Sequence, residues 1–235
     1  MVTRSRVAII PARGGSKRIE KKNIINFCGK PMIAWTIEAA KKSEIFERIV
    51  VSTDDHEIAD VAQQYGASVP FFRKHYSDDL SPVSLVTIGT LSQLREEVGE
   101  EYEVAVQLMA NCPLRNERNI INACDYFQSV NVSSQISCFK FGWMNPWWAA
   151  TLSEDGRPNK LFPEASKTRS QDLPPLYCPT GAIWIAKVAG LMQHQTYHTP
   201  DHIFWPMPWK DAVDIDDKED LRMAEVLYLM DHRTS

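Results

Sequence analysis

The chain has 235 residues, of which 44% are hydrophobic and 24% are charged, a balance that supports one large folded domain and excludes a disordered chain. Its formal net charge of −4 argues against nucleic acid as a partner, so any anionic ligand must be held by a local group of basic residues. There is no apolar run of membrane-spanning length, and the five scattered cysteines contain no CxxC pair, so we expect a cytoplasmic protein with reduced thiols and no membrane contact.

A short apolar strand followed by a small basic loop opens the chain. Residues 7–10 (VAII) have strand character, and Pro11 ends the strand because a proline cannot donate to a sheet ladder. The loop over residues 12–18 reads ARGGSKR, and residues 21–23 (KKN) add a second basic cluster. Glycines let backbone N–H groups approach an anion while Arg and Lys supply charge, so this loop indicates a phosphate site. It matches neither the Walker loop nor GxGxxG, and a strand-to-helix turn with solvated charges is the alternative.

Strands and helices alternate along the rest of the chain. We expect helices over residues 31–43, 57–64, 83–98, 119–127 and 218–231, and strands over 49–52, 68–72, 103–109, 135–141 and 181–186, with extended segments at 204–207 and 213–216. The pattern predicts a single α/β domain over residues 1–235, with a Rossmann-like, mostly parallel sheet and helices on both faces. Ligands of such sheets bind beyond the carboxyl ends of the strands, so the segments after residues 10, 72 and 109 should converge on one crevice.

Two aspartates follow the second predicted strand. We expect Thr53 or Asp54 to cap the next helix, with Glu57 completing a capping box. Metal binding by Asp54 and Asp55 is the alternative.

Residues 142–180 differ in character from the rest of the chain. Trp143, Trp147 and Trp148 lie close together in a Pro-rich stretch. Such a segment is typical of an exposed arm that becomes buried against another chain, so we expect a dimerisation arm and a homodimer. A lid or a core-covering loop is the alternative.

A pair of aspartates near the C-terminus could bind a metal. Residues 213–221 read VDIDDKEDL, and if they end a strand, Asp214 and Asp216 point to the same side. Two carboxylates on one side suit Mg²⁺, which prefers a few carboxylate oxygens together with water and phosphate oxygens. A cap of the last helix by Asp216 or Asp217 is the alternative.

Motifs at both ends of the chain resemble one family. Residues 9–24 (IIPARGGSKRIEKKNI) are similar to the N-terminal signature of the acylneuraminate cytidylyltransferases, roughly IPARGGSKGIPxKNI, with Arg18 and Glu20 in place of Gly and Pro. The family's C-terminal metal motif, (D/E)IDxxEDL, aligns on Asp214 and Asp216. The resemblance implies that CTP and a 2-keto sugar acid, such as a sialic acid-like nonulosonate, give a CMP-sugar acid and pyrophosphate, with Mg²⁺ as the cofactor.

The resemblance also assigns roles to residues. It implies a CTP site of Ala12, Arg13, Gly14, Gly15, Ser16, Lys17, Lys22 and Asn23 for the triphosphate and ribose, with Arg73 and Ser84 reading the cytosine. It implies a catalytic set of Arg13, Lys17, Lys22, Asp214 and Asp216, in which the two aspartates hold the metal. From the residues alone, Arg73 can also be a loop cation and Ser84 a helix cap.

The sugar side departs from the family pattern. The family often has QPTSPLR where residues 109–115 read MANCPLR, so Met109 replaces a common sugar-contacting glutamine and Asn111 is a polar substitute. Residues 167–187 resemble a family segment ending in PNGAIYI, which implies that Arg169 reaches the sugar acid across the dimer and that Trp184 lines its pocket. Cys112 and Cys178 have no recognisable His partner, so we interpret them as packing residues.

Two alternatives remain beside this hypothesis. The first is a cytidylyltransferase for the shorter sugar acid Kdo, but that family usually opens with IPARxxSxRLPxK, whereas this chain has Gly14 and Gly15. The second is a non-catalytic nucleotide-binding scaffold, which the retained Arg13, Lys17 and paired aspartates disfavour.

Overall fold

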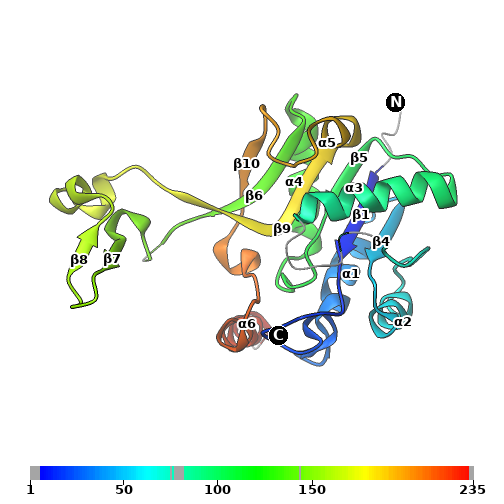
Figure 1. The fold of residues 1–235 in the computed structure, drawn as a ribbon, viewed down its shortest axis with the longest axis horizontal. Coiled ribbons are helices and arrows are strands. Elements are labelled where there is room, and N and C mark those ends of the chain that lie inside the picture. Colours follow the sequence, from blue (N-terminus) through cyan, green and yellow to red (C-terminus); the bar gives the residue numbers. More distant parts are fainter. Residues whose placement is uncertain (1–5, 75, 77–81, 143, 233–235) are drawn as a thin grey trace.

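A six-stranded sheet forms the centre of the computed structural model, which describes residues 6–74, 76, 82–142 and 144–232 (Figure 1). In order across the sheet, the strands are β10 (Ile203–Pro206), β6 (Ser134–Lys140), β9 (Tyr177–Lys187), β5 (Val104–Gln107), β1 (Arg6–Pro11) and β4 (Arg48–Ser52). Adjacent strands run parallel except β9, which is antiparallel to both of its neighbours. The predicted mostly parallel sheet is therefore confirmed.

Helices cover both faces of this sheet, because successive side chains of a strand point to opposite faces. Ala8 and Ile10 of β1 pack in one core with α1 (Met32–Ser43), α2 (His56–Gln64) and α4 (Glu117–Ser129). Val7 and Ile9 pack in the other core with α3 (Val83–Gln93) and α5 (Val188–His194). The predicted helices on both faces are confirmed, and a further turn, Leu94–Val98, extends α3 to the expected end.

The last helix, α6 (Lys218–His232), packs against a small hairpin of β2 (Asn26–Phe27) and β3 (Lys30–Pro31). Phe27 is fully buried, and its ring centroid lies 6.1 Å from that of Trp35 and 6.0 Å from that of Tyr228. This packing brings the C-terminal segment beside the loop that follows β1. Among the described residues, no helix combines the length and the apolar character needed to cross a bilayer.

The third strand predicted over residues 68–72 is wrong. Only Ser68 joins the sheet, through a single bridge to Val50. Its N–H donates to the Ile49 carbonyl at 2.8 Å, and its carbonyl accepts from the Val51 N–H at 2.9 Å. Pro70 follows two residues later and has no N–H to continue the ladder, so the segment leaves the sheet.

The extended end expected at residues 213–216 is not a strand either. A 3₁₀ turn, Trp209–Ala212, precedes it, and one backbone bond holds it, from the Ile215 N–H to the Asn111 carbonyl at 2.9 Å. The two aspartates are therefore placed by a contact with the segment after β5 and not by a sheet.

The cap of α2 is Asp55, one residue later than expected. Its side chain accepts a hydrogen bond from the Ile58 N–H at 3.1 Å. Because the helix begins at His56, Glu57 falls one position too early in the helix for a capping box. Asp54, freed from capping, accepts instead from the Gly14 N–H at 2.9 Å.

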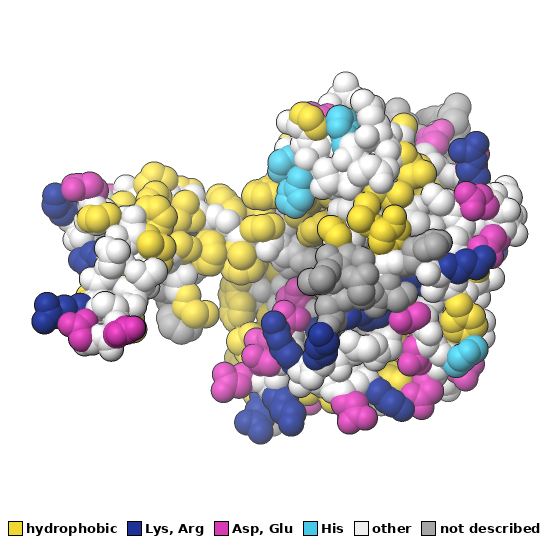
Figure 2. All heavy atoms as spheres, in the orientation of Figure 1, with side chains coloured by type: hydrophobic (Ala, Val, Ile, Leu, Met, Phe, Trp, Pro, Cys, Tyr) yellow, Lys and Arg dark blue, Asp and Glu magenta, His cyan; other side chains and the backbone are white. Residues whose placement is uncertain are grey.

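A long arm projects from the body between β6 and β9 (Figure 1). It carries the short strands β7 (Ala150–Leu152) and β8 (Pro158–Lys160) and three 3₁₀ turns, Pro146–Trp148, Pro163–Lys167 and Ser170–Asp172. Hydrophobic side chains gather along it in Figure 2, and Leu152 and Leu161 are 72% and 55% exposed. The predicted protrusion of residues 142–180 is confirmed, although Trp143 lies outside the described residues. Its role in forming a homodimer stays a prediction.

Candidate active site

A cavity of about 550 Å³ lies at the carboxyl ends of β1 and β5, which are adjacent and parallel. Five parts of the chain line it: the end of β1 with the loop that follows, the segment after residue 72, the start of α3, the segment after β5 and the C-terminal aspartate pair. The lining residues are Pro11, Arg13, Ser16, Lys17, Arg18, Ile19, Lys22, Asn23, Arg73, Tyr76, Val83, Val86, Met109, Asn111, Asp214 and Asp216. The predicted convergence of three chain segments on one crevice is confirmed.

The loop after β1 presents its cations to this cavity while its backbone is held elsewhere. The Ala12 N–H donates to the Ser52 carbonyl at 3.0 Å, which continues the pairing of β1 with β4. The Asn23 side-chain amide donates to the Arg13 carbonyl at 2.9 Å and so ties the second basic cluster to the first. A Cβ on Gly15 would meet open space. The loop therefore has the construction expected of an anion site.

Lys22 joins this loop to the C-terminal pair. Its ammonium donates to the Ile215 carbonyl and to an Asp216 carboxylate oxygen, both at 2.9 Å. Arg18 also lies 3.3 Å from Asp216. Arg18 belongs to the predicted basic loop and replaces the family's glycine, but it is not among the site residues predicted from the sequence.

Asp214 reaches the cavity with a side chain that is open to solvent yet closely flanked by protein groups. This partial desolvation, reinforced by the negative charge of Asp216, raises the pKa of Asp214 to about 6, and Lys22 opposes the shift. The Asn111 side-chain amide donates to Asp214 and also to the Ile215 carbonyl, at 3.3 Å in the second case. Asn111 therefore lies in the cavity as predicted, where it orients an aspartate.

The donors around Asp214 suit a magnesium ion. Mg²⁺ binds one or two carboxylates and takes its other ligands from water and phosphate oxygens. Asp214 and Asp216 supply two carboxylates in a cavity with a cationic, phosphate-type loop, and the buried Oδ1 of Asn111 has no hydrogen-bond partner. In the described part of the chain, no group of three or more His, Cys, Asp or Glu could hold a metal. The two aspartates are thus the candidate ligands.

Arg73 places a buried guanidinium in the same cavity. Burial lowers the pKa of Arg73, the charge of Asp54 opposes this shift, and nearby Arg13 adds to it. One terminal nitrogen donates to the Tyr76 carbonyl at 3.3 Å, whereas Nε and the other terminal nitrogen have no hydrogen-bond partner. These two donors are suited to a carbonyl or phosphate oxygen of a ligand.

Six predicted site residues do not line the cavity, namely Ala12, Gly14 and Gly15 of the loop and, elsewhere in the chain, Ser84, Trp184 and Arg169. The hydroxyl of Ser84 lies in the first turn of α3 and accepts from the Tyr197 N–H at 3.4 Å. The Trp184 indole donates to the Thr180 carbonyl at 2.7 Å, and its ring packs on Tyr197. Arg169 lies on the arm and pairs with Asp172 at 2.8 Å. Their predicted contacts with the base and the sugar acid stay predictions.

Met109 belongs to the apolar part of the cavity wall, together with Ile19, Val83 and Val86. A Cβ on Gly181 would lie 2.9 Å from Met109 Cγ and 3.5 Å from Asp214 Oδ2, so the methionine lies over β9 beside the aspartate. Gln107, two residues earlier, is fully buried and accepts from the Thr87 hydroxyl at 2.7 Å. It therefore does not replace the family's glutamine.

The cysteines near the cavity have the properties of packing residues. Cys112 is fully buried, and burial raises its pKa well above the usual value. Burial likewise raises the pKa of Cys124, on α4, to about 12. Cys178, the other cysteine interpreted as a packing residue, is half-buried, and burial raises its pKa as well. Raised pKa values disfavour the thiolate, which agrees with a packing role for these residues.

We expect Cys112 and Cys124 to resist alkylation in the native protein. Their burial denies access to the reagent, and their raised pKa values remove the reactive thiolate. Iodoacetamide at pH 8, followed by mass spectrometry, should modify both residues only after unfolding in urea. Labelling of native Cys112 at the rate of a free thiol would contradict this packing.

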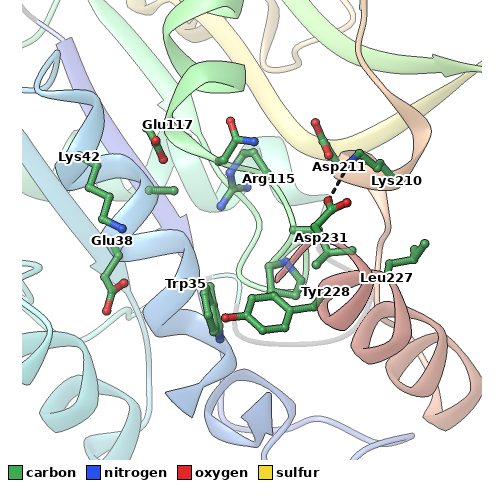
Figure 3. A pocket seen from close by; sticks show the side chains of 14 residues that line it. Trp35, Glu38, Lys42, Arg115, Glu117, Lys210, Asp211, Leu227, Tyr228 and Asp231 are labelled. Atoms are coloured by element: carbon green, nitrogen blue, oxygen red, sulfur yellow. Dashed lines mark hydrogen bonds and ion pairs between the residues drawn. The ribbon is translucent and has the colours of Figure 1, made fainter. Parts of the chain in front are cut away.

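A second cavity, of about 410 Å³, lies between α1, the start of α4 and α6 (Figure 3). Its charges are mixed, and Lys210 pairs with Asp231 at 2.6 Å across one side of it. Arg115 is fully buried beside it and donates to the Ala182 carbonyl at 2.7 Å, which ties the segment after β5 to β9. None of the predicted catalytic residues lines this cavity.

The cationic loop, the paired aspartates and the parallel sheet agree with one family. The family model described as Cytidylyltransferase matches residues 7–140, a stretch that contains the loop, Arg73 and the end of β5. The chain belongs to the cytidylyltransferase family. The match confirms the resemblance inferred from the two terminal motifs.

Curated relatives of this cytidylyltransferase are named for several nonulosonic acids. The pseudaminic acid cytidylyltransferase of Campylobacter jejuni (strain 81-176) is 35% identical over 231 residues, which covers 97% of this chain and 98% of the relative. The CMP-N,N'-diacetyllegionaminic acid synthase of Legionella pneumophila is 33% identical over 227 residues, covering 94% of this chain and 95% of the relative. Full-length similarity extends the family match to the arm and to the C-terminal aspartates.

Solved structures share the fold of this cytidylyltransferase. A CMP:2-keto-3-deoxy-manno-octonic acid synthetase complexed with CTP has a TM-score of 0.70 over 97% of this chain and 99% of that chain, at 15% sequence identity. A 4-diphosphocytidyl-2C-methyl-D-erythritol synthase from Anaerococcus prevotii has a TM-score of 0.63 at 14% identity, covering 97% of this chain and 99% of that chain. At such identities the likeness shows the fold alone.

Proposed function

We propose that this cytidylyltransferase joins CTP to a sialic acid-like nonulosonate, giving a CMP-sugar acid for cell-surface glycan synthesis and releasing pyrophosphate. The observation that carries the proposal is one cavity in which a cationic glycine loop faces the Asp214 and Asp216 carboxylates. The names of the full-length relatives support a nonulosonate as the acceptor. Five free cysteines suit the cytoplasmic location that we also propose.

The charges in the cavity suit a nucleotidyl transfer. The anomeric hydroxyl of the sugar acid attacks the α-phosphorus of CTP in line, a new P–O bond forms, and the bond to pyrophosphate breaks, so that pyrophosphate and the hydroxyl proton are released. Such transfers are catalysed by positioning and charge stabilisation. Arg13 and Lys17 stabilise the leaving pyrophosphate, and Lys22 fixes the segment that carries the aspartates.

Magnesium is part of the proposal. Asp214 and Asp216 would hold the ion, with the unpartnered Asn111 oxygen beside them. When bound, the ion neutralises charge on the α-phosphate and lowers the pKa of the attacking hydroxyl. Arg73, whose Nε and one terminal nitrogen have no hydrogen-bond partner, donates to O2 and N3 of the cytosine.

The reaction is tested by measuring pyrophosphate release with CTP, UTP or ATP and a panel of nonulosonates and Kdo. We expect release with CTP and a nonulosonate, dependent on Mg²⁺. Release with Kdo alone would favour the Kdo alternative. CTP binding without turnover on any acid would favour the scaffold alternative.

The arm completes the proposal, since we infer that the enzyme is a homodimer joined through it. Large apolar side chains such as Leu161 and Phe162, 55% and 40% exposed, are costly to leave in water. A dimer would also bring Arg169 of one chain toward the cavity of the other, where it can pair with the carboxylate of the sugar acid.

Replacing Leu161 by aspartate should convert the dimer to a monomer, because a charge then replaces buried apolar area at the contact. Light scattering at micromolar concentration measures the mass. Arg157→Asp is the matched control on the same arm. The Arg157 side chain is 85% exposed and forms an ion pair with Asp155, two residues away in the sequence. A wild-type monomer that is fully active would contradict the prediction.

A further inference from the structure

The short turn that follows β4 contacts the phosphate-type loop at its glycine. The Gly14 N–H donates to Asp54 Oδ1 at 2.9 Å. A Cβ on Gly14 would lie 2.5 Å from Asp55 Oδ2, so this position requires a glycine. Neither aspartate lines the active-site cavity. The loop is thus held by the carboxylate of Asp54, which is not itself part of the cavity wall.

The same turn also holds Arg73. The Thr53 carbonyl accepts from the Arg73 N–H at 2.8 Å, and an Asp54 carboxylate oxygen lies 3.9 Å from the guanidinium. This contact draws the guanidinium toward the turn but leaves its Nε and one terminal nitrogen without a hydrogen-bond partner. A single carboxylate therefore contacts both the loop and a cation that lines the cavity.

The negative charge of Asp54 offsets the repulsion between two cations that line the cavity. Arg13 and Arg73 line one cavity, and the positive charge of Arg13 and burial both lower the pKa of Arg73, whereas Asp54 raises it. Two like charges in a partly buried space repel one another unless an anion lies between or beside them. Without a bound nucleotide, the carboxylate of Asp54 lies 3.9 Å from the Arg73 guanidinium and offsets this repulsion.

We propose that Asp54 is a positioning residue for CTP, because it holds the Gly14 amide and the Arg73 guanidinium in their binding arrangement before the nucleotide enters. The inference rests on the proposed function, in which the loop binds phosphate and Arg73 contacts the nucleotide. Groups that are fixed in advance lose less conformational entropy on binding, so the effect falls on nucleotide affinity.

Two variants of Asp54 separate the hydrogen bond from the charge. Asp54→Ala removes both, whereas Asp54→Asn keeps an oxygen that can accept from the Gly14 N–H but has no charge for Arg73. Asp201→Ala is the matched control, since Asp201 also accepts from a backbone N–H, that of Ser133 at 2.8 Å, and lies outside the cavity lining.

The measurements are the affinity for CTP by calorimetry without sugar acid, the steady-state constants, and the amide proton resonance of Gly14. We expect Asp54→Ala to weaken CTP binding and raise the KM for CTP about tenfold, the size of a lost hydrogen bond to a charged group. The kcat and the KM for the sugar acid should change less than about threefold. Asp54→Asn should fall between wild type and Asp54→Ala, and it should keep the Gly14 resonance close to its wild-type position.

Each contrary result has a distinct meaning. If the wild-type protein binds CTP and Asp54→Ala binds CTP with the same affinity, the inference about Asp54 is overturned but the proposed function stands. In another outcome, both Asp54 variants melt at a lower temperature, their kcat falls, and the KM values for CTP and for the sugar acid rise by similar factors. That result would show that Asp54 has only a structural role, and it would also overturn the inference. Wild-type protein that fails to bind CTP would overturn the proposed function and this inference with it.

Discussion

Replacing Asp214 by asparagine is expected to lower the rate of pyrophosphate release by about 10²–10³-fold, the usual cost of removing a main charge contact of a transition state. Asp214 faces the cavity beside the cationic loop, and the amide of asparagine is a poorer magnesium ligand than a carboxylate. Asp216→Ala should also nearly abolish turnover, since it removes the second carboxylate and the partner of Lys22.

The fold should tolerate the Asp214 change. Partial desolvation raises the pKa of Asp214 above that of an unfolded carboxylate, so at pH 8 the ionised side chain opposes folding and an uncharged asparagine removes that opposition. We therefore expect the melting temperature of Asp214→Asn to equal or exceed that of wild type while activity falls.

Asp211→Asn is the matched control for this prediction. Asp211 is also an aspartate whose pKa is raised by desolvation, but it lines the second cavity and accepts from the Asn119 side chain at 3.1 Å. It should keep the wild-type rate. An Asp214→Asn enzyme that retains most of its magnesium-dependent rate would refute the metal assignment.

Removing the guanidinium of Arg13 should have the second large effect. Arg13→Ala is expected to lower kcat by about 10²–10³-fold, because the cation meets charge that develops on the leaving pyrophosphate. Its backbone carbonyl, which accepts from Asn23, is unchanged by the substitution. Single-turnover pyrophosphate release at saturating CTP isolates this step from nucleotide binding.

Arg18→Ala is the internal comparison for Arg13. Both cations lie in one loop and line one cavity, but Arg18 is largely exposed and pairs with Asp216 at 3.3 Å. Exposed ion pairs contribute about 0–1 kcal/mol, so we expect less than a tenfold effect. Equal losses from the two variants would show that the loop acts through its net charge and not through the placement of Arg13.

The sheet and its crevice could be predicted because they depend on local patterns. Runs such as residues 7–10 and 104–106 are apolar throughout, as is typical of strands covered on both faces, and Gly-Gly beside Arg and Lys marks the loop that needs backbone N–H groups near an anion. Strands β1 and β5 are adjacent and parallel and end at the same edge of the sheet, which is why the segments that follow them converge as predicted. The segment after residue 72 is brought to the cavity by the bond from the Arg73 N–H to the Thr53 carbonyl.

The errors arise where a distant contact outweighs a local preference. Residues 213–216 have the alternation of a strand, yet they are held by Asn111, which is about a hundred positions earlier in the chain. Asp54 has the sequence signature of a helix cap, but Gly14 lies within reach and the cap moves to Asp55. Neither contact leaves a trace in the neighbouring sequence, so pattern and propensity could not find them.

The base of the arm has a consequence for how such enzymes can diversify. β6 leaves the sheet and β9 returns to it as paired neighbours, with Lys140 opposite Tyr177 and the Phe141 N–H bonded to the Leu176 carbonyl at 3.0 Å. The two ends of the arm therefore lie side by side, as in a hairpin with a very long loop. Insertions or deletions beyond this point leave the register of the central strands unchanged, so the length of the arm can vary without disturbing the strands that carry the CTP cavity.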